Sequence, residues 1–376
     1  MDNIILKRII SDNTHLAKFL GEKEAVTMVW KIINRFTAMI KVDMGNDLDM
    51  IMAMSQMVLG WGENEHITAD YEILESCLSA AREYLGQSGR GALVSVADFS
   101  DEIFDFYKNG YDSGISIKGW PKLSQHYRIA KRELTTITGI PGHGKSEWLD
   151  QIMVNLAQEY NWKFAIFSPE NYPYPVHFEK IISKITGKPF HNGPSERLTA
   201  DEISDNMGFI NDHFIFLSPD ENDLSFDAIL NLAEKAKTEH KIDGVVIDPW
   251  NQLEHKRGNN KSETEHIGES LTKASRYARR HDIALWIVAH PTKQFKDDKG
   301  NYRPPTAYDI SGSAHWFNKS DNVITVFRNA DNNVDINIQK IKYKIRGKTG
   351  VVNMEYNKIN GIYTETMVSA GSPWAD

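Results

Sequence analysis

The sequence predicts an α/β protein with a mostly parallel, twisted sheet, preceded by a small all-α N-terminal domain. From residue 133 onward, short segments that are apolar at every position alternate with segments of helical period. This alternation is typical of strands that are buried on both faces of a parallel sheet. Residues 1–90, in contrast, show apolar residues at helical spacing only, as in helices with one buried face.

The composition is that of a globular protein. The 376 residues are 41% hydrophobic and 25% charged, and a chain of this length has room for a large core beside a small one. Its net charge of −8 provides no overall basic field to attract nucleic acid. The single cysteine, Cys77, excludes an internal disulfide and a cysteine-based zinc module. Because no apolar run reaches the ~18 residues of a membrane helix and the start lacks a signal-peptide core, we expect a cytoplasmic protein.

Three segments are expected along the chain. Residues 1–90 form the small helical domain, and the glycine-rich segment 86–91 has the composition of a flexible joint. Residues 91–112 form a linker with a short helix that ends at Gly110, and residues 113–376 form the α/β domain. An apolar stripe on the linker helix needs a covering surface, in its own domain or in a neighbouring subunit, and consists of Phe99, Ile103, Phe106 and Tyr107.

Six buried strands are expected in the α/β domain, each of them a short apolar run. Between the fourth and fifth strands, Ser262 and Glu265 have the spacing of a capping box at the start of a helix. Since parallel sheets bind ligands at the carboxyl ends of their strands, the polar residues that follow these runs are candidate site residues. The predicted strands are residues 134–138, 164–167, 214–217, 245–247, 284–289 and 323–327.

The sequence from Gly139 to Ser146, GIPGHGKS, matches the phosphate-binding loop pattern G-x-x-x-x-G-K-[ST]. It follows the first predicted strand and opens a helix, as such a loop requires. Its backbone N–H groups can surround phosphates, Lys145 can reach the β- and γ-phosphates, and Ser146 can ligate Mg²⁺. His143 is interpreted as a tolerated side chain rather than a participant. The predicted nucleotide-binding residues are Gly139, Pro141, Gly142, His143, Gly144, Lys145, Ser146 and Glu147.

Polar residues follow three further predicted strands. Asp248 ends the fourth strand and is expected to hold Mg²⁺ together with Ser146. Glu170 follows the second strand and can act as the base that activates the attacking water, the alternative being a solvent-facing loop glutamate. His290 follows the fifth strand. It either senses the γ-phosphate or is a structural histidine at the strand end.

The segment 340–348 alternates basic and apolar residues. As a strand, it would place five cations on one face and three apolar residues on the other. The preceding residues have the opposite phase, which implies a bulge near Gln339. Five like charges in alternation favour a bound phosphate or nucleic acid over a solvated face. These cations are Lys340, Lys342, Lys344, Arg346 and Lys348.

Two long polar segments, residues 251–261 and 292–313, follow the fourth and fifth predicted strands. Loops of this length in a compact domain are usually functional or disordered. Each of them holds several cations, which suit the phosphates of a nucleic acid. The candidate DNA-binding residues are Lys256, Arg257, Lys293, Lys296, Lys299 and Arg303.

Taken in order, these motifs resemble the ATPase domain of DnaB-like ring helicases, in particular the Twinkle-type and phage branch. The resemblance spans about residues 111–360. It rests on GWPKL (119–123) and KRELT (131–135) before the phosphate loop, SPE (168–170), IDPW (247–250), VAHP (288–291) and DISGSAHWFNKSDN (309–322).

What the resemblance implies is a RecA-like core that assembles as a hexameric ring around single-stranded DNA, with ATP at subunit interfaces and movement from 5′ to 3′. It implies that Lys145 and Ser146 hold phosphate and Mg²⁺ and that Glu170 is the catalytic base. It also implies that Asp248 is the acidic partner of the metal and that His290 senses the γ-phosphate. The two long polar segments correspond to DNA-tracking loops, and the linker helix docks on the adjacent subunit.

The sequence departs from the family at the basic residue that acts in trans on the ATP of a neighbouring subunit. The family has a Lys-x-Arg pattern on a late strand, whereas this chain has Lys342, Lys344 and Arg346 in that region. Arg346 is the first choice for the trans-acting residue because a planar guanidinium suits γ-phosphate oxygens, and Lys342 and Lys344 are the substitutes.

Residues 1–90 are too few for a fused primase catalytic domain, so we expect them to bind a primase, a loader or a polymerase, or to tie the ring together. The leading hypothesis is a replicative DNA helicase of a bacterial or virus-infected cell. One alternative is an ATPase on the same core that coats single-stranded DNA without unwinding, like a recombinase or a loader. The other is a P-loop kinase of small molecules or a signalling ATPase with no DNA role.

Overall fold

The computed structural model describes residues 96–366 except 221, 255–261, 293–295, 297–301 and 311–312. The helices predicted within residues 1–90, together with Cys77 and the glycine-rich joint, lie outside the described residues. The chain divides into two compact units, and the division falls between Gly110 and Tyr111. Among the described residues, no helix is both long enough and apolar enough to cross a lipid bilayer.

The helix predicted in the linker is present in the first unit. Helix α6 (Ser100–Asn109) follows the short 3-10 helix η1 (Val96–Phe99) and ends just before Gly110, as the sequence predicts. Ile103, Phe106 and Tyr107, which belong to the predicted apolar stripe, have exposed side chains.

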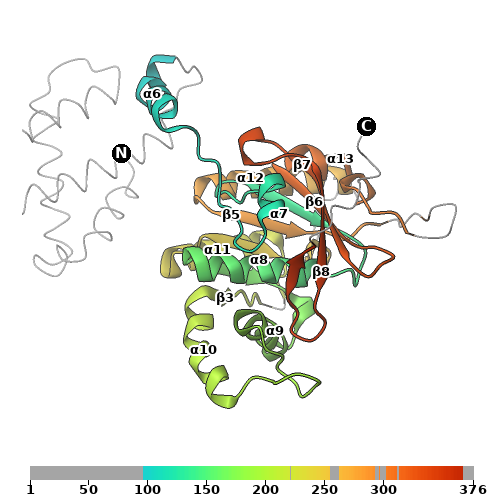
Figure 1. Ribbon diagram of the computed structural model, residues 1–376. Coiled ribbons are helices and arrows are strands. Elements are labelled where there is room, and N and C mark those ends of the chain that lie inside the picture. Colours follow the sequence, from blue (N-terminus) through green and yellow to red (C-terminus); the bar gives the residue numbers. More distant parts are fainter. Residues whose placement is uncertain are drawn as a thin grey trace, which may run out of the picture. The chain divides into compact units, whose positions relative to one another are not determined.

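The second unit is built on one nine-stranded sheet with the order β3-β2-β4-β5-β1-β6-β7-β8-β9 (Figure 1). Strands β1 to β6 pair in parallel, and β7, β8 and β9 pair in antiparallel fashion. The prediction of a mostly parallel sheet is therefore confirmed. The strands are β1 Leu134–Thr138, β2 Phe164–Phe167, β3 Phe214–Phe216, β4 Gly244–Ile247, β5 Ala284–Val288, β6 Asn322–Arg328, β7 Val334–Ile341, β8 Gly350–Tyr356 and β9 Tyr363–Glu365.

Helices cover both faces of this sheet, and each set of helices shares one hydrophobic cluster with the strands. Successive strand residues divide between the clusters, as Ile166 and Phe167 do, because side chains of a strand alternate between its faces. The first set is α7 Pro121–His126, α8 Lys145–Tyr160, α9 Tyr174–Thr186 and α10 Ala200–His213, and the second is α11 Phe226–His240, α12 Glu263–Arg280 and α13 Ser313–Lys319. This three-layer packing explains why the parallel strands are apolar at every position.

The capping box predicted for the start of α12 is confirmed. The Ser262 hydroxyl accepts a hydrogen bond of 3.2 Å from the Glu265 backbone N–H, and the Glu265 carboxylate accepts one of 2.9 Å from the Ser262 N–H. The two bonds satisfy N–H groups that have no partner within the helix itself.

The prediction of a basic strand over residues 340–348 is wrong. Strand β7 ends at Ile341, and the chain then turns through the short 3-10 helix η5 (Lys344–Arg346) before β8 begins. The cations therefore do not follow one another along a single strand, and Lys342 and Arg346 form ion pairs with carboxylates of the same chain.

The bulge predicted near Gln339 is confirmed. Val323 of β6 pairs with Lys340, and Ile324 pairs with Ile338, so Gln339 is the extra residue of β7. The Gln339 side chain donates hydrogen bonds to the Thr325 hydroxyl at 2.7 Å and to a nearby backbone carbonyl. These bonds fix the position of the bulge against β6.

Candidate nucleotide-binding site

The phosphate loop lies at the carboxyl edge of the parallel strands. It follows β1, whereas Glu170, Asp248 and His290 follow β2, β4 and β5. These four strands are neighbours in the order β2-β4-β5-β1, and the carboxyl ends of parallel strands meet at one edge of a sheet. The structure therefore brings the predicted elements of the nucleotide site together.

Lys145 is held inside the phosphate loop. Only 5% of its surface is exposed, and its ammonium group donates hydrogen bonds to the carbonyl oxygens of Gly139 (3.0 Å) and Ile140 (3.2 Å). Burial lowers the pKa of Lys145 to about 8, while the carboxylates of Asp248 and Glu170 act in the opposite direction. The two carbonyl oxygens are neutral acceptors, so a phosphate in the loop would give this buried ammonium group a fully charged partner.

Gly144 meets a conformational and a packing requirement at the start of α8. Its φ of 95° is one that glycine adopts readily, and a side chain here would run into the hydroxyl of Tyr363. That hydroxyl donates a hydrogen bond of 3.1 Å to the Gly144 carbonyl oxygen. Strand β9 thus supports the helix N-terminus that would face a phosphate.

Ser146 and Asp248, the predicted metal ligands, are hydrogen-bonded through their side chains. Asp248 is buried at the end of β4, and burial raises its pKa to about 6 against the effect of the bond to Ser146. A hydroxyl and a carboxylate are hard oxygen donors and fit Mg²⁺, which takes its other ligands from water and phosphate. No cluster of three or more His, Cys, Asp or Glu among the described residues could hold a metal ion, so a metal here would need ligands beyond the protein.

Glu170, His290 and Gln252 converge beside the phosphate loop. Glu170 Oε1 lies 3.6 Å from His290 Nε2 and accepts a long hydrogen bond of 3.4 Å from Gln252 Nε2. The Glu170 side chain is 45% exposed, so water can reach its carboxylate. Burial, with the nearby charge of Lys145, lowers the pKa of His290. The imidazole is therefore neutral near pH 7 and can exchange a hydrogen bond with the carboxylate or with a phosphate.

Asn251 and Gln252 also contact the site, although no sequence pattern predicts them. The Asn251 side-chain oxygen accepts a hydrogen bond of 2.9 Å from the His290 backbone N–H, which fixes the end of β5 to the segment after β4. Both residues closely follow Asp248, and this closeness in sequence to a predicted site residue could have indicated that they contact the site. The sequence does not reveal which polar side chains at the start of a long loop turn back toward the sheet.

A buried hydrogen-bonded pair of titratable residues next to the site was not predicted either. Asp150 of α8 and His177 of α9 lie 2.9 Å apart, and both side chains are almost fully buried. Burial alone would raise the pKa of Asp150, but the paired histidine lowers it; likewise burial would lower the pKa of His177, but Asp150 raises it. The pair ties the helix that carries Lys145 and Ser146 to the helix that follows Glu170.

The side chains of His143 and Glu147 contact protein groups. His143 Nδ1 accepts a hydrogen bond of 2.9 Å from the Arg328 backbone N–H. Glu147 forms ion pairs with Lys180 (3.0 Å) and Lys184 (2.7 Å) of α9. His143 therefore has a partner in β6, and Glu147 keeps its backbone N–H as a group for a phosphate.

A cavity of about 440 Å³ adjoins the start of α8. Its walls come from α9, from residues 189–194 and from the turn 358–361 between β8 and β9. Glu147, which directly follows Ser146, contributes to one wall. One wall of the cavity is therefore the residue next to the phosphate loop in sequence. The cavity is large enough for a small organic group.

The three cations predicted to act in trans lie at the opposite edge of the sheet. Strand β7 runs antiparallel to β6 and ends where β6 begins, and the three cations follow β7. The phosphate loop lies beyond the far end of β1, whose five residues span on the order of 17 Å. None of the three cations is placed to reach the phosphate loop of its own chain.

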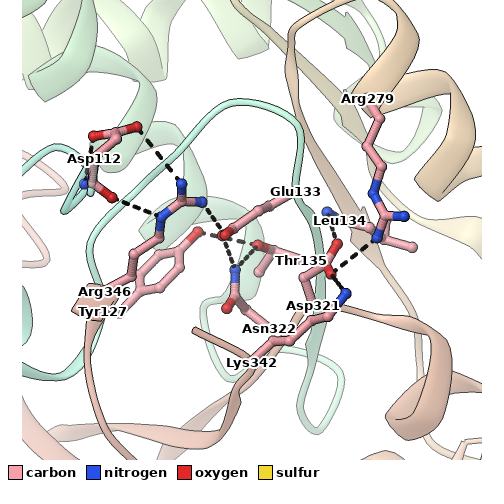
Figure 2. A network of polar contacts seen from close by, with 11 residues as sticks. Asp112, Tyr127, Glu133, Leu134, Thr135, Arg279, Asp321, Asn322, Lys342 and Arg346 are labelled. Atoms are coloured by element: carbon pink, nitrogen blue, oxygen red, sulfur yellow. Dashed lines mark hydrogen bonds and ion pairs between the residues drawn. The ribbon is translucent and has the colours of Figure 1, made fainter. Parts of the chain in front are cut away.

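The three cations differ in their partners, and Figure 2 shows those of Arg346 and Lys342. Arg346 forms an ion pair with the buried Glu133, and Lys342 forms one of 2.8 Å with the buried Asp321. Lys344 is exposed and has no ion-pair partner within the described part of the chain. The arginine that was the first choice from sequence is thus bound within its own chain, whereas Lys344 projects into solvent.

Two of the predicted DNA-binding residues can be placed. Arg303 forms an ion pair of 2.9 Å with Asp309, and the Lys296 ammonium lies 4.9 Å from the centre of the Tyr302 ring. The other four, Lys256, Arg257, Lys293 and Lys299, lie outside the described residues.

Comparison with known sequences identifies two relationships. Residues 121–364 match the family of the DnaB-like helicase C-terminal domain. The chain is also 38% identical over 294 residues to the Twinkle homolog protein, chloroplastic/mitochondrial, of Arabidopsis thaliana, and this match covers 75% of the chain. The chain spans 41% of the length of that relative.

Two solved structures have a similar fold. One is an ATPase domain, with a TM-score of 0.59 and 17% identity over 72% of this chain and 99% of that chain. The other shows a DnaB-like replicative helicase and its interactions with primase, with a TM-score of 0.58 and 16% identity over 91% of this chain and 79% of that chain. These similarities confirm the predicted RecA-like fold of the α/β unit.

Proposed function

Because the chain belongs to the family of DnaB-like helicase C-terminal domains, we propose that it is an ATP-dependent replicative DNA helicase. It moves from 5′ to 3′ along single-stranded DNA as a hexameric ring with ATP at the subunit interfaces. The observation that carries the proposal is the meeting of Lys145, Ser146, Glu170, Asp248 and His290 at one edge of the sheet. That edge offers a phosphate cradle, a metal site and a carboxylate exposed to water, which are the parts that ATP hydrolysis needs.

Each of these residues has a distinct part in hydrolysis. The backbone of the phosphate loop and Lys145 bind the phosphates. Ser146 and Asp248 hold Mg²⁺, which neutralises charge on the phosphate oxygens when bound. Glu170 orients the attacking water and accepts its proton. His290, 3.6 Å from Glu170, contacts the γ-phosphate and transmits its presence to the segment after β5.

The segments after β4 and β5 follow DNA through the channel of the ring. Lys296 and Arg303, with the cations of the same segments at 256, 257, 293 and 299, contact DNA phosphates. Residues 1–90 bind a primase, a loader or a polymerase, or tie the ring together; primase is the partner shown with one of the similar structures. The protein works in the cytoplasm of a bacterial or virus-infected cell.

Lys344 is the cation that acts in trans on the ATP of the neighbouring subunit. Arg346 and Lys342 each have a buried carboxylate as partner, and moving either cation to a phosphate would break an ion pair with a buried charge. Lys344 lies between them, is exposed, and has no ion-pair partner in the described segments. It can therefore approach a phosphate without breaking an existing bond.

Replacing Lys344 with alanine should lower kcat for DNA-stimulated ATP hydrolysis by about 100-fold, the usual effect of losing one group that stabilises transition-state charge. ATP binding should persist because the phosphate loop is intact. Steady-state kinetics and nucleotide titration measure the two effects. Lys235→Ala, which removes an exposed lysine from α11, is the matched control and should keep normal turnover. A normal kcat in Lys344→Ala would refute the trans role.

The proposed function is tested by steady-state ATP hydrolysis with and without single-stranded DNA at two salt concentrations. We expect DNA to stimulate turnover several-fold and the stimulation to fade as salt rises, because contacts with DNA phosphates release counterions. Unwinding of a forked duplex should then accompany hydrolysis.

Other outcomes would contradict the proposal in distinct ways. DNA-stimulated turnover without fork unwinding, together with the mass of an open filament, would indicate a recombinase-like or loader-like ATPase. Robust turnover that is indifferent to DNA would indicate a P-loop kinase or signalling ATPase.

A further inference from the structure

Two buried carboxylates lie at the start of β1, the strand that leads to the phosphate loop, and Figure 2 shows them bound to the segment after β7. We call residues 342–348 the cationic turn. Glu133 pairs with Arg346, and Asp321 pairs with Lys342. The two carboxylates thus contact the cationic turn near its two ends.

Glu133 depends on its partners because it is only 3% exposed. Burial raises its pKa, while a hydrogen bond of 2.8 Å from Asn322 and the charge of Arg346 act against that shift. Arg346 also contacts Asp112, with 3.7 Å between Nη2 and the carboxylate. Since a buried carboxylate without a counter-charge is strongly unfavourable, Glu133 holds the guanidinium in this one position.

Asp321 connects the cationic turn to β1 directly. One of its carboxylate oxygens accepts a hydrogen bond of 3.0 Å from the Leu134 N–H, the first residue of β1, and the other binds Lys342. Its backbone carbonyl accepts the Lys342 N–H at 3.0 Å. Arg279 of α12 lies 3.5 Å from the same carboxylate. The start of β1, the start of the turn and α12 therefore meet at one side chain.

The backbone of the cationic turn is fixed at its far end as well. The Arg346 carbonyl oxygen accepts the Arg128 N–H at 2.8 Å, and the Lys348 N–H donates to the His126 carbonyl at 3.1 Å. Gly347 has a φ of 149°, and a side chain there would overlap the His126 carbonyl oxygen. The middle of the turn, Lys344 and Ile345, is exposed.

We propose that Glu133 and Arg346 are positioning residues that hold the cationic turn against the start of β1 and so present Lys344 to the neighbouring subunit. The inference rests on the proposed function, in which Lys344 acts in trans. It assigns Arg346 an indirect role: the guanidinium binds Glu133 of its own chain and does not touch the ATP of the neighbour. Glu133 directly precedes β1, and β1 leads to the phosphate loop. The segment that anchors the turn for one neighbour therefore also leads to the site that the other neighbour completes.

The first test compares Glu133→Gln, Arg346→Gln and the double variant. Each should lower kcat about 10- to 100-fold, the range expected when a reacting group is displaced by about 1 Å, with the KM for ATP unchanged because the phosphate loop is intact. The double variant should show no further loss, and neither should Glu133→Gln combined with Lys344→Ala. The double variant also removes both buried charges, so it tests the proposal even where a single variant folds poorly.

Lys131→Gln is the matched control. It breaks another half-buried ion pair at the same edge of the sheet, Lys131 to Asp243 at 2.6 Å, without touching the cationic turn. We expect it to lower the melting temperature but to leave kcat unchanged, which separates positioning from general stability.

Mixed rings give a readout that a purely structural role would not change. Glu133→Gln subunits keep an intact phosphate loop, and Lys145→Ala subunits keep an intact cationic turn. When the two impaired variants are mixed in equal amounts, about a quarter of the head-to-tail interfaces should combine an intact loop with an intact turn. Turnover of the mixture should therefore exceed the mean of the two variants measured separately.

The outcomes separate this inference from the function on which it rests. Normal kcat in Glu133→Gln with an inactive Lys344→Ala would overturn the positioning role and leave the trans role standing. Loss of kcat in Arg346→Gln with normal kcat in Glu133→Gln would make Arg346 itself the trans-acting residue. Normal kcat in Lys344→Ala would overturn both statements.

Discussion

Lys145→Ala should abolish ATP turnover, with a loss in kcat of at least about 1000-fold. Lys145 is 5% exposed, and its ammonium group is held by two carbonyl oxygens of the phosphate loop. Such a buried, preorganised cation acts on developing phosphate charge in a site of low dielectric, where its effect is far larger than in water. Alanine leaves the loop backbone in place but removes that charge.

The measurement is phosphate release at saturating ATP, with the melting temperature as a check of folding. Lys118→Ala, which removes an exposed lysine that pairs with Glu159 at 2.7 Å, is the control and should keep normal turnover, because exposed ion pairs contribute little. Retained turnover in Lys145→Ala would contradict the assignment of this loop as the phosphate site.

The buried core of the α/β unit could be predicted from sequence because its signal is local. Strands β1 and β2 begin and end where their apolar runs do, and β3 and β5 end one residue earlier than predicted. The bulge at Gln339 was also predictable, since the change in apolar phase lies within a few residues of it.

The network around the cationic turn could not be predicted, because its partners are distant in sequence. Glu133 and Arg346 are separated by 213 positions, and alternation alone could not tell a basic strand from a turn whose cations bond to buried carboxylates. The same reason applies to Asp150 and His177, which come from two different helices. Local patterns predict which residues are buried, whereas pairs of buried charges depend on how the helices and strands come together.

The residues of the candidate site also differ in whether local sequence patterns predict them. Lys145, Glu170, Asp248 and His290 were predicted because each lies in a segment that follows a predicted strand, and the topology places the ends of these strands at one edge. Gln252, which contacts Glu170, was missed because its role depends on the direction of a side chain in a loop. Residues placed by strands are therefore the ones that sequence can identify.

Glu170→Gln should permit ATP binding and block hydrolysis, with a loss in kcat of about 1000-fold, within the range that general bases contribute. The Glu170 carboxylate is 45% exposed and lies 3.6 Å from His290 Nε2, so it can bind a water and accept its proton. Glutamine has the same shape and can still accept the hydrogen bond from Gln252, but its amide cannot take up the proton. Lys145 and Ser146 are untouched, so the affinity for ATP should stay near that of the unaltered protein.

Nucleotide titration and phosphate release separate these two effects. Glu196→Gln, which removes a highly exposed carboxylate paired with Lys188, is the matched control and should hydrolyse ATP normally. Under the proposed function, Glu170→Gln should also remain bound to single-stranded DNA in the presence of ATP, because a protein that binds but cannot hydrolyse ATP does not leave the ATP-bound state. Normal turnover in Glu170→Gln would show that Glu170 is not the catalytic base. Weak nucleotide binding would instead indicate that Glu170 holds the nucleotide or its metal.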